Sequence, residues 1–105
     1  VEGAVSQSLG YALCEEMPYD GEGQPQMRDL RDYHIFTADE MPELLTEFVP
    51  TVEPTHPYGV KAVGEVPMDG VGPAVANAIY DAVGAWINEL PATPERVWRA
   101  MHLGH

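Results

Sequence analysis

The chain has 105 residues, of which 17 are acidic and 5 are basic, so its formal net charge at pH 7 is −12. This length supports one domain at most, with a modest core, and the apolar fraction of 45% is ordinary for a globular protein. The excess of acid excludes nucleic acid and disfavours an anionic membrane surface as partners, because both attract clustered Lys and Arg. It predicts a solvated, self-repelling surface.

Targeting signals and cysteine usage point to a compartment. The chain contains no apolar run of about 18 residues and no basic leader followed by an apolar stretch, so the sequence supports neither a membrane span nor secretion. The single cysteine, Cys14, cannot form a disulfide within the chain, which is compatible with a reducing environment. We therefore expect a cytoplasmic protein.

Residues 1–16, VEGAVSQSLGYALCEE, carry apolar residues at helical spacing. Those that fall four apart are Val1, Val5, Leu9 and Leu13. The same residues also occupy alternate positions, so the pattern leaves a strand open. Gly3 and Gly10 weaken a lone helix by about 1 kcal/mol each relative to Ala, and they would be tolerated where another backbone packs close. The segment begins without a cap, which is expected of a helix cut from something longer.

The middle of the chain is acidic and rich in turn residues. Asp20-Gly21 and Gly23 have the chemistry of a tight reversal between two extended arms, which predicts a β-hairpin excursion. Residues 30–36 and 44–49 are expected to be extended or in strands, with a short turn between them. This region is predicted to be a solvated excursion around a core built elsewhere.

Two helices are expected in the last third of the chain. Residues 72–87, GPAVANAIYDAVGAWI, have small or apolar side chains around most of the cylinder, which predicts burial on several sides. Residues 90–101 carry a start signal, with Thr93 as N-cap and Pro94 at the first helical position. The fold class predicted for residues 1–105, a single domain or fragment, is α+β: two main helices flank a short mixed sheet, with the hairpin as an excursion.

A search for chemistry leaves few candidates. The sequence has no nucleotide-binding glycine motif, no CxxC and no HExxH, and its four histidines lack ligand spacing. Glu65 is the exception, because it follows Ala-Val-Gly and precedes Val-Pro, as expected for a carboxylate set into a pocket wall. Such neighbours would limit its solvation and strengthen it as a base. Gln7 is a more distant second candidate.

Five blocks resemble the C-terminal part of the molybdenum-binding (large) subunit of the xanthine dehydrogenase and aldehyde oxidase family. VEGAVSQSLGYALCEE is similar to the family form EGxxxQGxGxALxEE, and DYHIFTADEMPEL to D-Y-x-I-P-T-x-x-D-x-P. GVKAVGEVP, PAVANAIYDAVG and LPATPERVWRA follow in the family's order. The resemblance implies a C-terminal portion of a molybdopterin-binding domain.

The resemblance also implies an activity. These enzymes are molybdenum hydroxylases, which add an oxygen taken from water to an aldehyde or an N-heterocycle and pass two electrons onward. Glu65 matches the family's general base, Gly64 precedes it and leaves room for the cofactor, and Gln7 matches a glutamine close to that cofactor, with a hydrogen bond to the metal's oxo group or the pterin. No residue of this chain is expected to ligate the metal directly.

Three positions depart from the family form: Ser8 replaces a glycine, Phe36 a proline and Val66 another proline. None of these changes removes a group that the implied mechanism needs. The glycine-rich pterin loops are absent, so the molybdenum–pterin cofactor would be shared with the rest of the subunit. Iron–sulfur clusters and FAD are expected on partner domains. The isolated chain is not expected to be active as an enzyme.

Two other readings stay open. The chain could be a non-catalytic assembly module, or an orphaned remnant that binds a partner subunit without doing chemistry. An acidic adaptor unrelated to molybdenum would require the matching blocks to be coincidental. All readings share one expectation, an exposed hydrophobic face that a partner covers, because the uncapped first segment and the apolar helix cannot bury each other fully.

Overall fold

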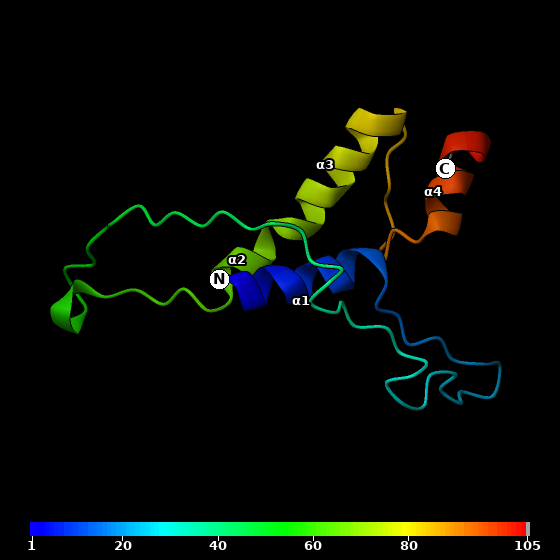
Figure 1. Ribbon diagram of the computed structural model, residues 1–105, viewed down its shortest axis with the longest axis horizontal. Helices are drawn as coiled ribbons and strands as arrows, with labels where there is room; N and C mark the ends of the chain where they lie inside the picture. The colour runs from blue at the N-terminus through cyan, green and yellow to red at the C-terminus, as the bar shows by residue number, and fades with distance from the viewer. Residues whose placement is uncertain (105) are drawn as a thin grey trace.

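The computed structural model describes residues 1–104 and consists of short helices joined by long irregular segments (Figure 1). The helices are α1 (Glu2–Leu13), the 3-10 helix η1 (Pro57–Gly59), α2 (Val66–Asp69), α3 (Val71–Val83) and α4 (Pro94–Leu103). The pattern at the start of the chain, which left helix and strand open, therefore forms a helix. None of these helices combines the length and the apolar character needed to cross a membrane.

Helix α1 is the centre of the packing. It contacts α2 and α3, while a hydrogen bond from the Ala92 amide to the Ala12 carbonyl (2.6 Å) joins the segment that precedes α4 to the C-terminal end of α1. The buried apolar residues are small: Ala12, Ala92 and Ala100 are 0%, 4% and 6% exposed. Small side chains allow the segments to approach closely, but they bury little apolar area. The described residues thus form a thin core rather than a self-contained one.

The predicted mixed sheet is not confirmed in residues 1–104. The structure has no strand there, only an isolated antiparallel bridge between Tyr19 and Pro25. The reversal between them is present, since both the Glu22 and Gln24 amides donate to Asp20 Oδ1 at 2.9 Å. The turn chemistry was therefore read correctly, but the arms are too short to make the predicted hairpin. A strand also needs a neighbour for its backbone groups, and residues 41–52 make no backbone hydrogen bond within the described chain.

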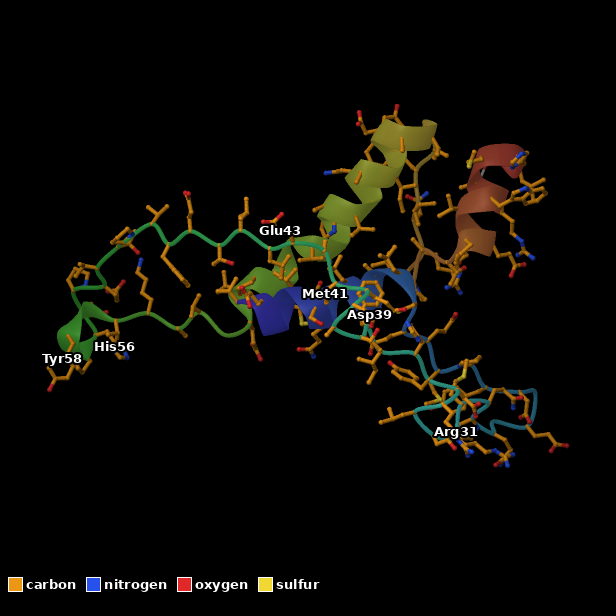
Figure 2. The ribbon with its side chains drawn as sticks, in the orientation of Figure 1. Arg31, Asp39, Met41, Glu43, His56 and Tyr58 are labelled. Atoms are coloured by element: carbon orange, nitrogen blue, oxygen red, sulfur yellow. The ribbon has the colours of Figure 1, made fainter. Side chains whose placement is uncertain are left out.

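Residues 43–64 form what we call the arm, two extended legs that run away from the helices and are closed at the tip by η1 (Figure 1). At the tip the Glu53 amide donates to the Gly59 carbonyl (3.1 Å), and Lys61 Nζ donates to Thr51 Oγ1 (2.9 Å). Figure 2 shows His56 and Tyr58 at this far end, well away from Met41 and Asp39 beside α1. The arm is thus held together locally and lies outside the helical body.

Helix α3 differs from expectation in length and burial. It ends at Val83 because Gly84 adopts the left-handed conformation (φ 71°), and Trp86 beyond it stacks on Tyr80 at 4.1 Å. None of its residues is buried, although burial on several sides was predicted. Val75 and Ile79 are half-buried against the described chain, while Ala78 and Ala82 on the rest of the helix are exposed. By contrast, α4 begins as predicted: the Arg96 amide donates to the Thr93 side chain at 3.3 Å.

Candidate functional site

Glu65 stands at the N-cap of α2, where the local sequence starts a short helix. Pro67 in the first turn pre-sets a helical backbone angle, and the Met68 amide donates to the Glu65 carbonyl at 2.9 Å. The Glu65 side chain makes no capping hydrogen bond to α2 and is exposed. Its carboxylate is therefore free of the helix that positions its backbone.

The predicted apolar enclosure of Glu65 is not present in residues 1–104. Val63 and Val66 are 46% and 64% exposed. Gly64 also borders open space, since a Cβ added there would meet no atom within 4 Å. The close approach expected at Gly64 is therefore not made by this part of the chain, and any wall facing Glu65 must come from elsewhere.

Gln7 lies exposed on α1, and its neighbour Ser8 connects that helix to α2. Ser8 is 4% exposed, and its Oγ donates a hydrogen bond of 2.9 Å to the Met68 carbonyl. Met68 is three residues beyond Glu65 in the same short helix. The structure therefore brings together the two helices that carry the two candidate side chains, which are far apart in the sequence. From the sequence alone, Ser8 was only a departure from the family form.

The hollows of the described chain lie away from these residues. One of about 410 Å³ lies between the start of α1 and residues 38–44, close to Met41 and Asp39 in Figure 2. Another of about 980 Å³ lies between residues 87–89 and α4. Neither is lined by Gln7, Gly64 or Glu65. The candidate residues are thus exposed and line neither of these hollows.

A charged junction that was not predicted from the sequence connects α4 to the segment that follows α1. Arg96 Nη2 lies 2.8 Å from Glu16 Oε1, and Arg96 Nη1 donates to the Pro91 carbonyl at 2.9 Å. The hydrogen bond to Glu16 raises the pKa of Arg96, so the guanidinium stays charged. This junction lies at the C-terminal end of α1, and its role is to stabilise the packing of α4.

The remaining reactive groups are engaged in local structure. Glu40 accepts from the Thr37 amide (2.8 Å) and lies 3.0 Å from His34 Nε2; the hydrogen bond from Thr37 holds its pKa below the usual value. Burial, helped by Glu15 and Glu40, raises the pKa of the Cys14 thiol. A protonated thiol is a weak nucleophile.

The exposed hydrogen-bonding groups of Gln7 and Glu65 suit one side of a cofactor site. The Gln7 amide can donate and accept hydrogen bonds, and the Glu65 carboxylate can accept them. No group of three or more His, Cys, Asp or Glu side chains in residues 1–104 could hold a metal ion. A metal beside Glu65 would therefore take its ligands from a cofactor or from protein beyond these residues.

Comparison with known proteins gives a consistent family. Residues 1–42 match a family described as a molybdopterin cofactor-binding domain. The chain is 36% identical over 102 residues to a probable hypoxanthine oxidase of Escherichia coli (strain K12), covering 96% of this chain and 11% of that protein. It is 39% identical over 104 residues to a putative xanthine dehydrogenase molybdenum-binding subunit of the same strain, covering 98% and 14%.

The fold comparison agrees. The structure superposes on quinoline 2-oxidoreductase from Pseudomonas putida 86 with a TM-score of 0.87 and 33% identity, covering 96% of this chain and 13% of that one. The chain therefore spans only about one eighth of the length of such relatives. Within that span, its sequence and fold match those of the molybdenum-binding large subunits of the xanthine dehydrogenase and aldehyde oxidase family.

Proposed function

We propose that this chain forms one wall of the active site of a molybdenum hydroxylase, with Glu65 as the general base. The observation that carries the proposal is the contact of α1 with α2 through Ser8 and Met68, which puts the Gln7 helix against the helix that begins at Glu65. Both candidate side chains are exposed and so available to a group that lies outside the chain.

The proposed division of labour follows from the two side chains. When bound, the molybdenum–pterin cofactor supplies the two-electron chemistry by which an oxygen from water reaches a carbon of the substrate. One carboxylate oxygen of Glu65 accepts the proton released from that water, which makes the water oxygen a better nucleophile. Gln7 donates its amide N–H to the cofactor and so orients it against Glu65. Gly64 has no side chain, so the cofactor can approach the backbone closely there.

The substrate class proposed is an aldehyde or an N-heterocycle. The names of the relatives include hypoxanthine, xanthine and quinoline, all of which are N-heterocycles. Electrons would pass to iron–sulfur clusters and FAD on partner domains, as the resemblance to the family implies. We place the assembled enzyme in the cytoplasm.

The arm is the proposed docking element for the rest of the molybdenum-binding subunit. Leu45, Val49 and Tyr58 are 89%, 85% and 100% exposed, a set of large apolar groups that a partner would cover. Residues 41–52 are extended with unpaired backbone groups, as a segment that adds to another sheet would be. The relatives extend far beyond the matched span, and that additional polypeptide is the cover we propose.

The test is Glu65→Gln in the complete molybdenum-binding subunit with its partners. A neutral amide cannot take up the proton, so turnover should fall by about a hundredfold or more, while the molybdenum content stays that of the wild type. Asp69→Asn is the matched control, because it neutralises another exposed carboxylate at the end of the same helix and should leave turnover unchanged. Near-normal turnover of a molybdenum-replete Glu65→Gln enzyme would overturn the assignment.

The alternative function, a non-catalytic assembly module, is favoured by the exposed apolar arm alone. It is distinguished by the molybdenum content and the native mass of the protein isolated from its own host. Stoichiometric molybdenum in an assembly far heavier than 11.5 kDa supports the hydroxylase. A large assembly that contains the chain but no molybdenum supports the module.

A further inference from the structure

Ser8 is the buried polar residue of the described chain, and it connects two helices that the proposed chemistry needs together. It is 4% exposed, while its neighbour Gln7 is exposed. Its Oγ donates to the Met68 carbonyl at 2.9 Å, across 60 positions of sequence. A buried hydroxyl that finds a partner so far along the chain holds tertiary structure and not merely its own helix.

The acceptor explains why this bond matters to α2. Helix α2 has 4 residues, so none of its last carbonyls finds a partner within the helix. Pro73 lacks an N–H and cannot supply one to Asp69 from the start of α3. The Ser8 hydroxyl satisfies the Met68 carbonyl from the side of α1. A helix this short has little stability of its own, and its orientation depends on such outside contacts.

We propose that Ser8 is a positioning residue for the reaction: by holding α2 on α1, it sets the separation between the Glu65 carboxylate and the Gln7 amide. This inference rests on the proposed function. Ser8 replaces the glycine of the family form EGxxxQG, and a glycine has no hydroxyl to donate. The tie between the two helices is therefore a feature that this chain adds at the site.

The first experiment compares Ser8→Ala and Ser8→Gly with Ser6→Ala in the complete molybdenum-containing enzyme. Ser8→Gly introduces the residue of the family form, so it guards against simple misfolding. Ser6 lies on the same helix, is half-buried and is not part of the tie, which makes it the matched control. Both Ser8 variants should lower kcat by about tenfold or more through misplacement of the base, with KM and molybdenum content unchanged. Ser6→Ala should behave like the wild type.

Hydrogen exchange gives a readout that does not depend on turnover. The Met68 amide of α2, which donates to the Glu65 carbonyl, should exchange about tenfold faster in both Ser8 variants than in the wild type or in Ser6→Ala, because the helix loses its tie to α1. Unchanged exchange in α2 would overturn the proposal whatever the kinetics. A loss of molybdenum or of global stability, with kcat per molybdenum unchanged, would also overturn it, since Ser8 would then act only on folding.

A double-mutant cycle with Glu65→Asp links Ser8 to the base. Once the carboxylate has been withdrawn by one methylene, its position is already wrong, so adding Ser8→Ala should cost much less than it does in the wild type. Additive losses would contradict a role in positioning Glu65. If Ser8→Ala is silent while Glu65→Gln abolishes turnover, this inference fails and the proposed function stands. If neither variant affects turnover, the proposed function itself fails.

Discussion

Replacing Arg96 by Met should loosen α4 without unfolding the rest of the chain. The Arg96 side chain is 26% exposed and bonds Glu16 at 2.8 and 3.4 Å and the buried Pro91 carbonyl at 2.9 Å. Methionine fills a similar volume but removes every one of these hydrogen bonds. The change therefore isolates the polar contribution of the junction from its packing.

The magnitude follows from the exposure of the partners. Glu16 is 41% exposed, so solvent screens the ion pair and leaves it about 1 kcal/mol. Leaving the Pro91 carbonyl without its donor costs about 1 kcal/mol more. A total of about 2 kcal/mol corresponds to roughly a 30-fold change in the equilibrium for local opening of α4.

The assay is amide hydrogen exchange across α4 in the complete subunit, with Arg99→Met as the control. Arg99 pairs with Glu95 one turn away on α4 itself, and both side chains are well exposed (60% and 71%). Such a pair contributes about 0.3–0.5 kcal/mol, so its loss should raise exchange only about twofold. If Arg96→Met also changed exchange by no more than twofold, the junction with Glu16 would not be what holds α4 to α1.

Three further predictions concern local structure. The pKa of Glu40 is lowered in the folded chain, chiefly by the Thr37 amide, so its contribution to stability is present above the ordinary glutamate pKa and is lost as the pH falls through the lower folded value. The Thr37 amide should therefore lose exchange protection as the pH falls below the ordinary glutamate pKa, and Glu40→Gln should remove that dependence on pH. Gly84→Ala should shorten the end of α3 and destabilise it by about 1 kcal/mol, because φ is 71° there. Gly3→Ala, in a helical position where a Cβ meets nothing within 4 Å, should instead stabilise α1 by about 0.5–1 kcal/mol in the same exchange measurement.

Local signals in the sequence were read correctly where neighbouring residues decide the structure. Thr93 followed by Pro94 caps α4 as predicted, because the cap depends on residues within one turn. The Asp20 turn formed for the same reason, since the carboxylate bonds amides two and four residues ahead. The mixed sheet did not follow, since strand formation requires a second strand that local pattern cannot provide.

The candidate residues divide in the same way. Glu65 was singled out by its small and apolar neighbours, yet those neighbours do not enclose it in residues 1–104. Gln7 came from the resemblance of the first block, whose family is confirmed by the comparisons, while its contact with a cofactor stays a prediction. Whether a residue is buried depends on what packs against its segment, and the nine residues GVKAVGEVP do not specify those packing partners.

The sequence by itself determined the start of α4, the Asp20 turn and the resemblance to the family, because each depends on residue types at short fixed spacings, whereas the pattern of the first segment left helix and strand open. Only the tertiary structure decided that Ser8 would reach the Met68 carbonyl and that Arg96 would reach Glu16. These pairs lie 60 and 80 positions apart, so their meeting depends on how the intervening chain folds back onto α1. Contacts of that kind arise from the packing of whole elements, which no local pattern specifies.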